Sequence, residues 1–506
     1  MTETAELINL VREQLEELRS QRREERERYE REKEEMQRLH KEQLRINTYC
    51  DVIGQSLICI ISGLPFMASN FSFHFRKFLA LFYTPVDTSF INQLPAPILE
   101  TIWKYFDFCQ RRRLESVCRK WRNQMCYDDI DLLTVTLTDR GLPSWEWFLV
   151  SLQRIGATLK TLKIGGSSED LSAMYRVPSD LMQLFCEWTP SLLSLELSRC
   201  IVSYQDLTQF SCTVTNLKLH SRIESGSESC QHADCEQITR MLNSFRNLTH
   251  LSLEICNPGF GELYLRLPNL IWMKHYGTIR PDLPSLCHHS TQVQELDLRY
   301  FGCESFWPIS RLTQLRVLRL SATGISDSEL SEICKSCSII ETLDLSSCSR
   351  IYDFSSLNSL SELKILIVAS AGAFDDKAAE NSLSSGTLEM LDATNTPLKA
   401  DGLKMLLSNN PRLKSVSLLH KTAGYETTLQ VLMTLCQAPK LQFVHSEAFL
   451  QLKAHDIVAF LEKRLEKCKN RAHLKIELIS EAMTDAAVKM ASDAGVSLAG
   501  PIEQFL

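Results

Sequence analysis

The sequence lacks the short motifs on which most enzymes and nucleotide-binding proteins depend. Among its 506 residues there is no G-x-x-x-x-G-K-S/T phosphate loop, no G-x-G-x-x-G fingerprint, no H-E-x-x-H zinc motif and no G-x-S-x-G nucleophile elbow. No nucleophile and base can be paired from the residues that remain. We therefore expect a protein that is not itself an enzyme and that carries no cofactor.

The chain also lacks a marked excess of charge of either sign. Its 55 lysines and arginines oppose 62 aspartates and glutamates, which gives a formal net charge of −7. A dedicated nucleic-acid binder would need a basic surface to neutralise phosphates, so we expect no nucleic-acid partner. The first residues do not form the basic and apolar regions of a secretory signal.

The 18 cysteines are spread along the whole chain without the short spacings of a disulfide-rich scaffold. We expect most of them to be buried thiols in a reducing compartment, the cytoplasm or the nucleus. The nearest metal-like cluster is Cys230, His232 and Cys235, but a zinc site needs four convergent ligands. We therefore predict loop thiols there and no metal site.

Residues 1–49 contain a dense run of charge. From Val11 to Arg45, 22 of 35 residues are charged, eleven of each sign, and there is no glycine or proline. A 4-3 spacing of apolar residues fits a coiled coil, although Arg22 and Glu25 lie on its seam. Two interpretations stay open: a coiled coil that joins two copies of the chain, and a single solvated helix.

Residues 50–88 are rich in phenylalanine. No charged residue occurs from 52 to 75, and these 24 residues are long enough to span a bilayer. Polar residues such as Gln55, Ser62 and His74 disfavour insertion. We interpret the segment as a linker, with a membrane span and translated non-coding sequence as the alternatives.

Residues 89–131 predict a compact helical module. Prolines at 95 and 97 suit the first turn of a helix, and apolar residues follow at helical spacing from Ile98 to Phe106 and again from Leu114 to Trp121. Two short helices cannot bury both apolar faces by themselves. They need a partner, which is either the rest of this chain or another protein.

Residues 132–480 contain an internal repeat. The template L-x-x-L-x-L-x-x-N/C-x-L, in which a short strand buries its leucines, occurs in a dozen copies. The copies start at Leu159, Leu192, Val214, Leu248, Leu270, Val293, Leu315, Ile340, Leu363, Leu388, Leu413 and Leu441. From Val214 onward the starts are 22 to 28 residues apart, except for one spacing of 34 residues that we assign to a polar insertion over 221–237.

This period predicts an α/β fold, a leucine-rich repeat solenoid. A helix near 455–468, a strand-like run at 474–479 and a helix over 484–493 follow the last copy, and we expect 481–506 to cap the array. The C-x-x-C pair Cys334 and Cys337 lies where the template places a helix. We therefore expect buried core thiols there and no redox pair.

The helical module and the repeats resemble a known family. Leu94-Pro95, Ile98-Leu99, Ile102 and the run from Val117 to Trp121 look like an F-box. Residues 324–351 are similar to the cysteine-containing leucine-rich repeat that often follows an F-box. The resemblance covers about 89 to 480. Pro97 departs from it, because the family usually has an acidic residue there.

The resemblance implies a substrate-recognition adaptor of a ubiquitin ligase. F-box proteins dock on a Skp-family linker held by a cullin, whose RING subunit recruits a ubiquitin-charged enzyme, while the repeats hold the protein target. The linker-binding residues implied are Leu94, Pro95, Ile98, Leu99, Ile102, Leu114, Val117 and Trp121. The alternative is a leucine-rich repeat scaffold that binds proteins without a ligase.

The strand positions between the template leucines should face the concave side of the solenoid. Tryptophan, tyrosine and arginine are the residue types most enriched in binding hot spots. We therefore hypothesise that the target binds at Trp272, Lys274, Tyr276, Arg299 and Arg319. The alternative is that Trp272 and Tyr276 pack against an irregular repeat or the insertion.

Overall fold

The computed structural model describes residue 111 and residues 131–137, 152–166, 174–225, 233–257, 261–419, 423–438, 440–467, 474–477 and 496–499. The chain divides into two compact units, Met1–Asp131 and Leu132–Leu506. The predicted charged helix (1–49), the linker (50–88) and nearly all of the F-box-like module (89–131) lie outside the described residues.

A parallel sheet of 16 strands runs through the second unit, and fifteen of them follow one another in chain order. These fifteen are β1 (Leu132–Leu137), β2 (Thr161–Gly166), β4 (Ser194–Ser203), β5 (Asn216–Glu224), β6 (His250–Ile255), β8 (Trp272–His275), β10 (Glu295–Asp297), β11 (Val317–Arg319), β12 (Thr342–Asp344), β13 (Ile365–Ile367), β14 (Met390–Ala393), β15 (Ser415–Leu418), β16 (Phe443–His445), β17 (Leu474–Glu477) and β18 (Val496–Ala499). The short β3 (Tyr175–Arg176) pairs with β4, while β7 (Gly261–Leu263) and β9 (Ile279–Pro281) form a separate pair.

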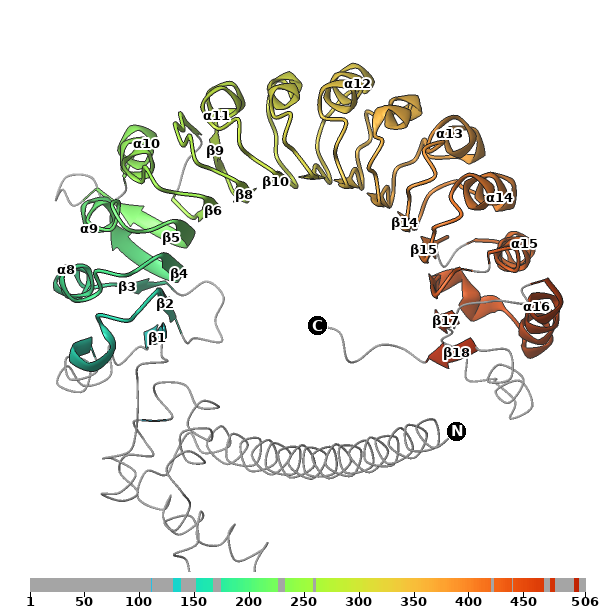
Figure 1. Ribbon diagram of the computed structural model, residues 1–506, viewed down its shortest axis with the longest axis horizontal. Helices are drawn as coiled ribbons and strands as arrows, with labels where there is room; N and C mark the ends of the chain where they lie inside the picture. The colour runs from blue at the N-terminus through green and yellow to red at the C-terminus, as the bar shows by residue number, and fades with distance from the viewer. Residues whose placement is uncertain are drawn as a thin grey trace, which may run out of the picture. The chain divides into compact units, whose positions relative to one another are not determined.

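Helices connect most successive strands of the sheet. They are α8 (Ser179–Trp188), α9 (Tyr204–Thr208), α10 (Cys235–Ser244), α11 (Leu283–His289), α12 (Asp327–Ser336), α13 (Asp376–Asn381), α14 (Ala400–Asn409), α15 (Tyr425–Leu435) and α16 (Ala454–Lys467), with the 3-10 helices η1 (Trp307–Arg311), η2 (Ser355–Ser359) and η3 (Glu447–Gln451). Within this unit the strands line the inner, concave side of an arc and the helices line its outer side (Figure 1). In the part of the chain that the structure describes, no helix combines the length and apolar character needed to cross a bilayer.

The structure confirms all twelve predicted repeat starts. Each start residue is buried, with at most 2% of its surface exposed, and in every copy a strand begins two residues later. Because each copy returns the chain to the same edge of the sheet, neighbouring strands pair in parallel. The fold of this unit is therefore a leucine-rich repeat solenoid.

Burial alternates along most strands as the template requires, while in β10 and β12 the aspartate that follows the buried leucine is buried as well. In β8, Met273 and His275 are buried, whereas Trp272 and Lys274 are half-buried. Since successive side chains of a strand point to opposite faces, the intervening positions face the concave side. His275 departs from the template, because it takes the place of a core leucine. Its Nε2 lies 2.9 Å from the carbonyl oxygen of Ile279, and burial lowers its pKa.

In six repeats a residue with left-handed backbone geometry follows the strand. These residues are Tyr300, Ala322, Ser347, Ser370, Asn395 and Leu419, with φ between 55° and 60°. Arg199 has the same geometry inside β4, at the register shift between Ser198 and Cys200. The turn directs the next residue back into the core, as at Phe301 and Cys348, which are both buried. L-residues other than asparagine and aspartate rarely adopt this geometry, so its repetition shows that the register of the array imposes it.

The predicted polar insertion needs correction. The polar insertion is shorter than 221–237, because β5 continues to Glu224 and α10 starts at Cys235. Asp234 caps that helix by accepting a hydrogen bond from the Gln237 amide at 2.7 Å. The pair His288 and His289 lies in the last turn of α11.

The C-terminal part of the chain is also more strand-like than predicted. The helix near 455–468 and the strand near 474–479 are present as α16 and β17. The predicted helix over 484–493 lies outside the described residues. Further on, Val496–Ala499 forms β18 and pairs in parallel with β17, so this part of the tail extends the sheet by one strand.

Candidate functional site

Strand pairing brings the predicted target-binding residues to adjacent positions on the concave face. Trp272 pairs in register with His250 on one side and Glu295 on the other. Lys274 pairs with Asp297, and Asp297 pairs in turn with Arg319. The row Lys274, Asp297 and Arg319 thus crosses three neighbouring strands, which lie about 4.8 Å apart.

Arg299 forms an ion pair with Asp297, two residues earlier in the chain. Its Nε and one terminal nitrogen donate to the two carboxylate oxygens of Asp297, at 3.0 and 2.9 Å. This hydrogen-bonded pairing raises the pKa of Arg299, and bidentate geometry is the strong form of such an ion pair. Arg299 therefore neutralises the nearly buried Asp297 and retains an exposed edge, with 41% of its side chain accessible.

Other aspartates of the same concave row accept hydrogen bonds from the backbone two residues later. Asp344 accepts the amide and the hydroxyl of Ser346 at 2.9 and 2.6 Å. Asp392 accepts the amide of Thr394 at 3.0 Å. Each carboxylate thereby holds the end of its own strand just before the left-handed turn, a local role that needs no ligand.

Lys274 and Arg319 differ from the other cations of the row. Lys163 and Lys218 both lie beside Glu196, with nitrogen–oxygen distances of 3.3 and 3.7 Å. Within the described part of the chain, the Lys274 ammonium and the Arg319 guanidinium make neither an ion pair nor a hydrogen bond. These two cations, one on each side of the neutralised Asp297, are therefore free to receive an acidic group.

Aromatic side chains flank this cationic row on both sides along the strand direction. Trp272 stacks on His250 with ring centroids 6.3 Å apart and an interplanar angle of 29°. At the other end of the strand, Tyr276 meets Tyr300 edge to face, with centroids 6.0 Å apart. Tyr276 is 51% exposed and Tyr300 is 68% exposed. The surface combines unpaired cations with accessible rings, the composition typical of binding hot spots.

The sequence prediction missed Tyr300. The residue follows the last buried leucine of its repeat by two positions, outside the alternating part of the strand. Tyr300 is at position eight of the template, a position that the template does not require to be buried. A large aromatic residue there is the sequence signal that could have identified it.

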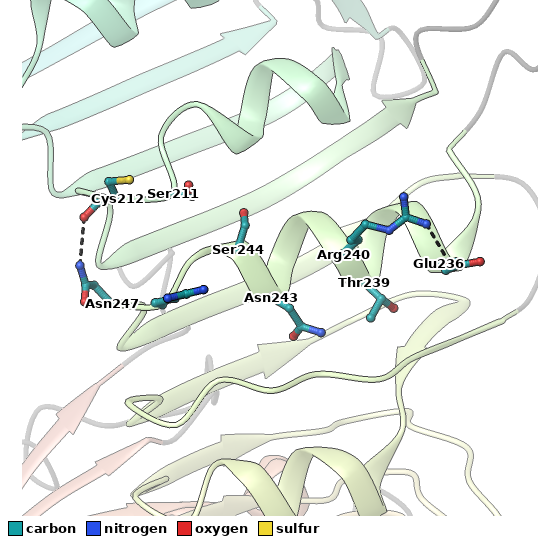
Figure 2. Close-up of a pocket in the computed structure, with 9 residues that line it drawn as sticks. Ser211, Cys212, Glu236, Thr239, Arg240, Asn243, Ser244 and Asn247 are labelled. Atoms are coloured by element: carbon teal, nitrogen blue, oxygen red, sulfur yellow. Dashed lines mark hydrogen bonds and ion pairs between the residues drawn. The ribbon is translucent and has the colours of Figure 1, made fainter.

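A groove lies on the helical side of the solenoid. It is an open groove of about 760 Å³ along α10, shown in Figure 2. Its polar groups are engaged within the chain: Asn247 donates to the Cys212 carbonyl of the preceding repeat at 2.9 Å, and Arg240 pairs with Glu236 inside α10 at 2.8 Å. Asn243 likewise donates to the carbonyl of Tyr264 at 2.9 Å. These contacts explain the groove as packing between repeats.

The prediction for Cys334 and Cys337 is confirmed. Both are buried free thiols, and burial raises the pKa of each to about 12. Cys337 donates to the carbonyl of Leu312 at 3.3 Å. Among the described residues no group of histidine, cysteine and acidic side chains could hold a metal ion; Cys230 and His232 lie outside the described residues, as do all eight predicted linker-binding residues.

No family model matches the sequence, and no curated protein matches it. Among solved structures, the chain is similar to the functional domain of InlJ from Listeria monocytogenes, which includes a cysteine ladder, at 15% identity and a TM-score of 0.38. That match covers 66% of this chain and 64% of the InlJ chain. The chain is also similar to internalin C2 from Listeria monocytogenes str. 4b F2365, at 17% identity and a TM-score of 0.26, with 53% of this chain and 83% of the other covered. The assignment of the repeat fold rests on this chain's own register and burial.

Proposed function

We propose that the solenoid is a protein-binding receptor whose target docks on a concave patch formed by Trp272, Lys274, Tyr276, Arg299 and Arg319. The observation that carries the proposal is the pairing pattern of the concave charges. The cations Lys163, Lys218 and Arg299 of this face pair with carboxylates of the chain, whereas Lys274 and Arg319 have no ion-pair partner among the described residues and lie beside aromatic rings. Charged groups left unpaired beside aromatic anchors favour a complementary protein surface.

The finer proposal is that the receptor belongs to a Skp–cullin–F-box type ubiquitin ligase. Its support is the sequence resemblance of residues 89–131 to an F-box, joined to a repeat domain. In this proposal the apolar residues from Leu94 to Trp121 bind the Skp-family linker, and the solenoid presents the target for ubiquitin transfer. The chain itself contributes no catalytic group. A ligase-independent scaffold is the competing function.

Target capture tests the first proposal. Tagged full-length chain is expressed in cells, and the proteins that co-purify with it are quantified for the wild type and for Trp272→Ala. Truncating a central aromatic anchor commonly costs about 2 kcal/mol or more of binding free energy, so the specific target should be lost. Lys163→Ala is the matched control, because Lys163 lies on the same face but pairs with Glu196. Equal capture by the wild type and Trp272→Ala would contradict the proposal.

Linker binding tests the second proposal. The double variant Leu94→Ala, Pro95→Ala should lose the Skp-family linker while it still captures the target, because the two surfaces belong to different units of the chain. If the wild-type chain never co-purifies with the linker, the scaffold function stands instead.

The proposed coiled coil at 1–49 adds a dimer to this scheme. Light scattering on the full chain and on a chain without residues 1–49 compares their masses. A coiled coil predicts a dimer that becomes a monomer on removal of the segment, whereas a solvated single helix predicts monomers in both cases.

A further inference from the structure

Tyr300 occupies a template position at which the four following repeats, with the same left-handed turn, carry small or polar side chains. It has φ of 60°, and the corresponding residues two positions after the last strand leucine include Ala322, Ser347, Ser370 and Asn395. For a bulky L-residue this left-handed geometry is costly. Asparagine would satisfy the same turn at lower cost, as Asn395 does later in the chain.

Burial does not offset that cost. Tyr300 is 68% exposed, whereas the next residue, Phe301, is 3% exposed and packs edge to face against His275 at 5.4 Å. Within the described residues, the ring of Tyr300 contacts the ring of Tyr276, which is itself half exposed. The tyrosine pair therefore presents aromatic surface to solvent at a position of backbone strain, a combination that points to binding.

The tyrosine pair is continuous with the unpaired cations. Tyr276 follows Lys274 by two residues in the same strand direction. The amide of Tyr300 donates to the carbonyl of Ser321 at 2.8 Å, and Ser321 follows Arg319 by two residues. At about 3.3 Å per residue, the aromatic groups lie roughly 7 Å from the cationic row along the strands.

We propose that the Tyr276–Tyr300 pair anchors a large apolar side chain of an acidic target segment, while Lys274 and Arg319 bind an acidic side chain two residues away. The segment lies extended along the strand direction, because two residues of an extended chain span the same distance of about 7 Å. This inference rests on the proposed function and names the chemistry of its target. Arg299, which is already satisfied by Asp297, shields that acidic group from the incoming carboxylate.

Tyr300→Asn separates a binding role from a structural one. Asparagine accepts the left-handed backbone, so the melting temperature should stay equal or rise, while binding of the target segment should fall by roughly thirtyfold, as for a hot-spot residue. If Tyr300 served only the packing of its repeat, the variant would melt earlier and bind equally well, and that result would overturn the proposal.

Random dodecapeptides displayed on phage supply the probe, panned against the immobilised full chain. Enriched peptides should share an acidic residue two positions from a large apolar one. They should bind Tyr300→Asn and the pair Lys274→Ala, Arg319→Ala weakly, and should bind the control Lys163→Ala as tightly as the wild type.

The outcomes distinguish this inference from the proposed function. Enriched peptides that lack the acidic–apolar pair but still require Trp272 would overturn the inference and leave the concave receptor standing. Peptides indifferent to every residue of the concave patch, or no enrichment at all, would overturn both.

Discussion

At the scale of single residues, the side chain of Asn257 continues the hydrogen bonding of β5 past the point where its pairing with β6 ends. Its side-chain oxygen accepts the amide of Ile223 at 2.7 Å, and its nitrogen donates to the carbonyls of Ile223 and Ala233 at 2.8 and 3.0 Å. Asn257 is buried. The side chain thus gives Ile223 the pair of bonds that an adjacent strand would give.

Replacing Asn257 by leucine should destabilise the solenoid by about 3 kcal/mol at nearly constant side-chain volume, because the Ile223 amide and the Ala233 carbonyl lose their partner. The Ile223 carbonyl keeps only the amide of Ala233, at 2.9 Å. Denaturant unfolding measures the loss, and hydrogen exchange of the Ile223 amide should accelerate in the variant. Asn247→Ala is the control, since Asn247 is exposed and makes one bond to Cys212. Slow exchange at Ile223 in Asn257→Leu would contradict this role.

Glu329 joins two repeats through one carboxylate. It accepts the amide and hydroxyl of Ser326 at 3.0 and 2.7 Å, and the amide of Phe306 and the hydroxyl of Ser305 in the preceding repeat at 2.8 and 3.1 Å. Burial by itself would raise the pKa of Glu329, but these hydrogen bonds outweigh it and leave the pKa below its ordinary value of 4.5.

The direction of that pKa change fixes the pH dependence. A carboxyl group whose pKa is lower in the folded state contributes its full stability above the unfolded pKa and loses it as the pH falls through the folded pKa. Glu329→Gln should therefore unfold at a lower urea concentration than the wild type at neutral pH, and the difference should shrink below pH 4.5. The exposed Glu362→Gln is the control. A difference that stays constant down to about pH 3 would refute the assignment.

At the scale of the repeated element, a line of alternating charges runs along one edge of the sheet. The residues immediately before five successive strands are Arg316, Glu341, Lys364, Glu389 and Lys414. Glu341 bridges Arg316 and Lys364, and Glu389 pairs with Lys414 at 2.6 Å. These edge charges pair with one another, so the unpaired cations at the centre of the concave face are the groups that remain available to a target.

Exposed ion pairs contribute little stability and are screened by salt. Glu341→Gln should lower the melting temperature slightly in dilute buffer, and the difference should vanish at about 1 M sodium chloride. Calorimetry at the two salt concentrations checks this, with Glu380→Gln on α13 as an unpaired comparison. A large decrease that persists in salt would show that the carboxylate has a structural role beyond the pair.

The repeat elements were predictable because one short period recurs twelve times and each copy must bury the same positions. Elements without the template were not predictable in this way: β1 begins at Leu132 before the first copy, and β18 follows the last one. The concave positions of Trp272, Lys274 and Arg319 follow from alternation alone. The pairing of Arg299 with Asp297 depends on side-chain direction within one strand, and the left-handed turn at Tyr300 is imposed by register, so neither could be read from residue type.

At the scale of the whole molecule, the described residues form an array in which many polar and charged groups already have partners within the chain. Its thiols are mostly buried, its aspartates hold strand ends, and its edge charges pair with one another. Among the cations of the concave face that the structure describes, Lys274 and Arg319 make no such pair, and the rings of Tyr276 and Tyr300 beside them are exposed. That contrast, more than the fold, indicates where a target binds, since a repeat fold by itself does not specify a ligand.

Site-specific photo-crosslinking in cells tests this account most directly. A photoreactive phenylalanine analogue replaces Tyr276 in the full chain, and in a second chain it replaces Met405, which is 40% exposed on α14 on the outer side of the arc. A target site on the concave face predicts a discrete crosslinked protein from position 276 that disappears when Lys274 and Arg319 are changed to alanine, and no such product from position 405. The same product from both positions, or from position 405 alone, would contradict a target site on the concave face.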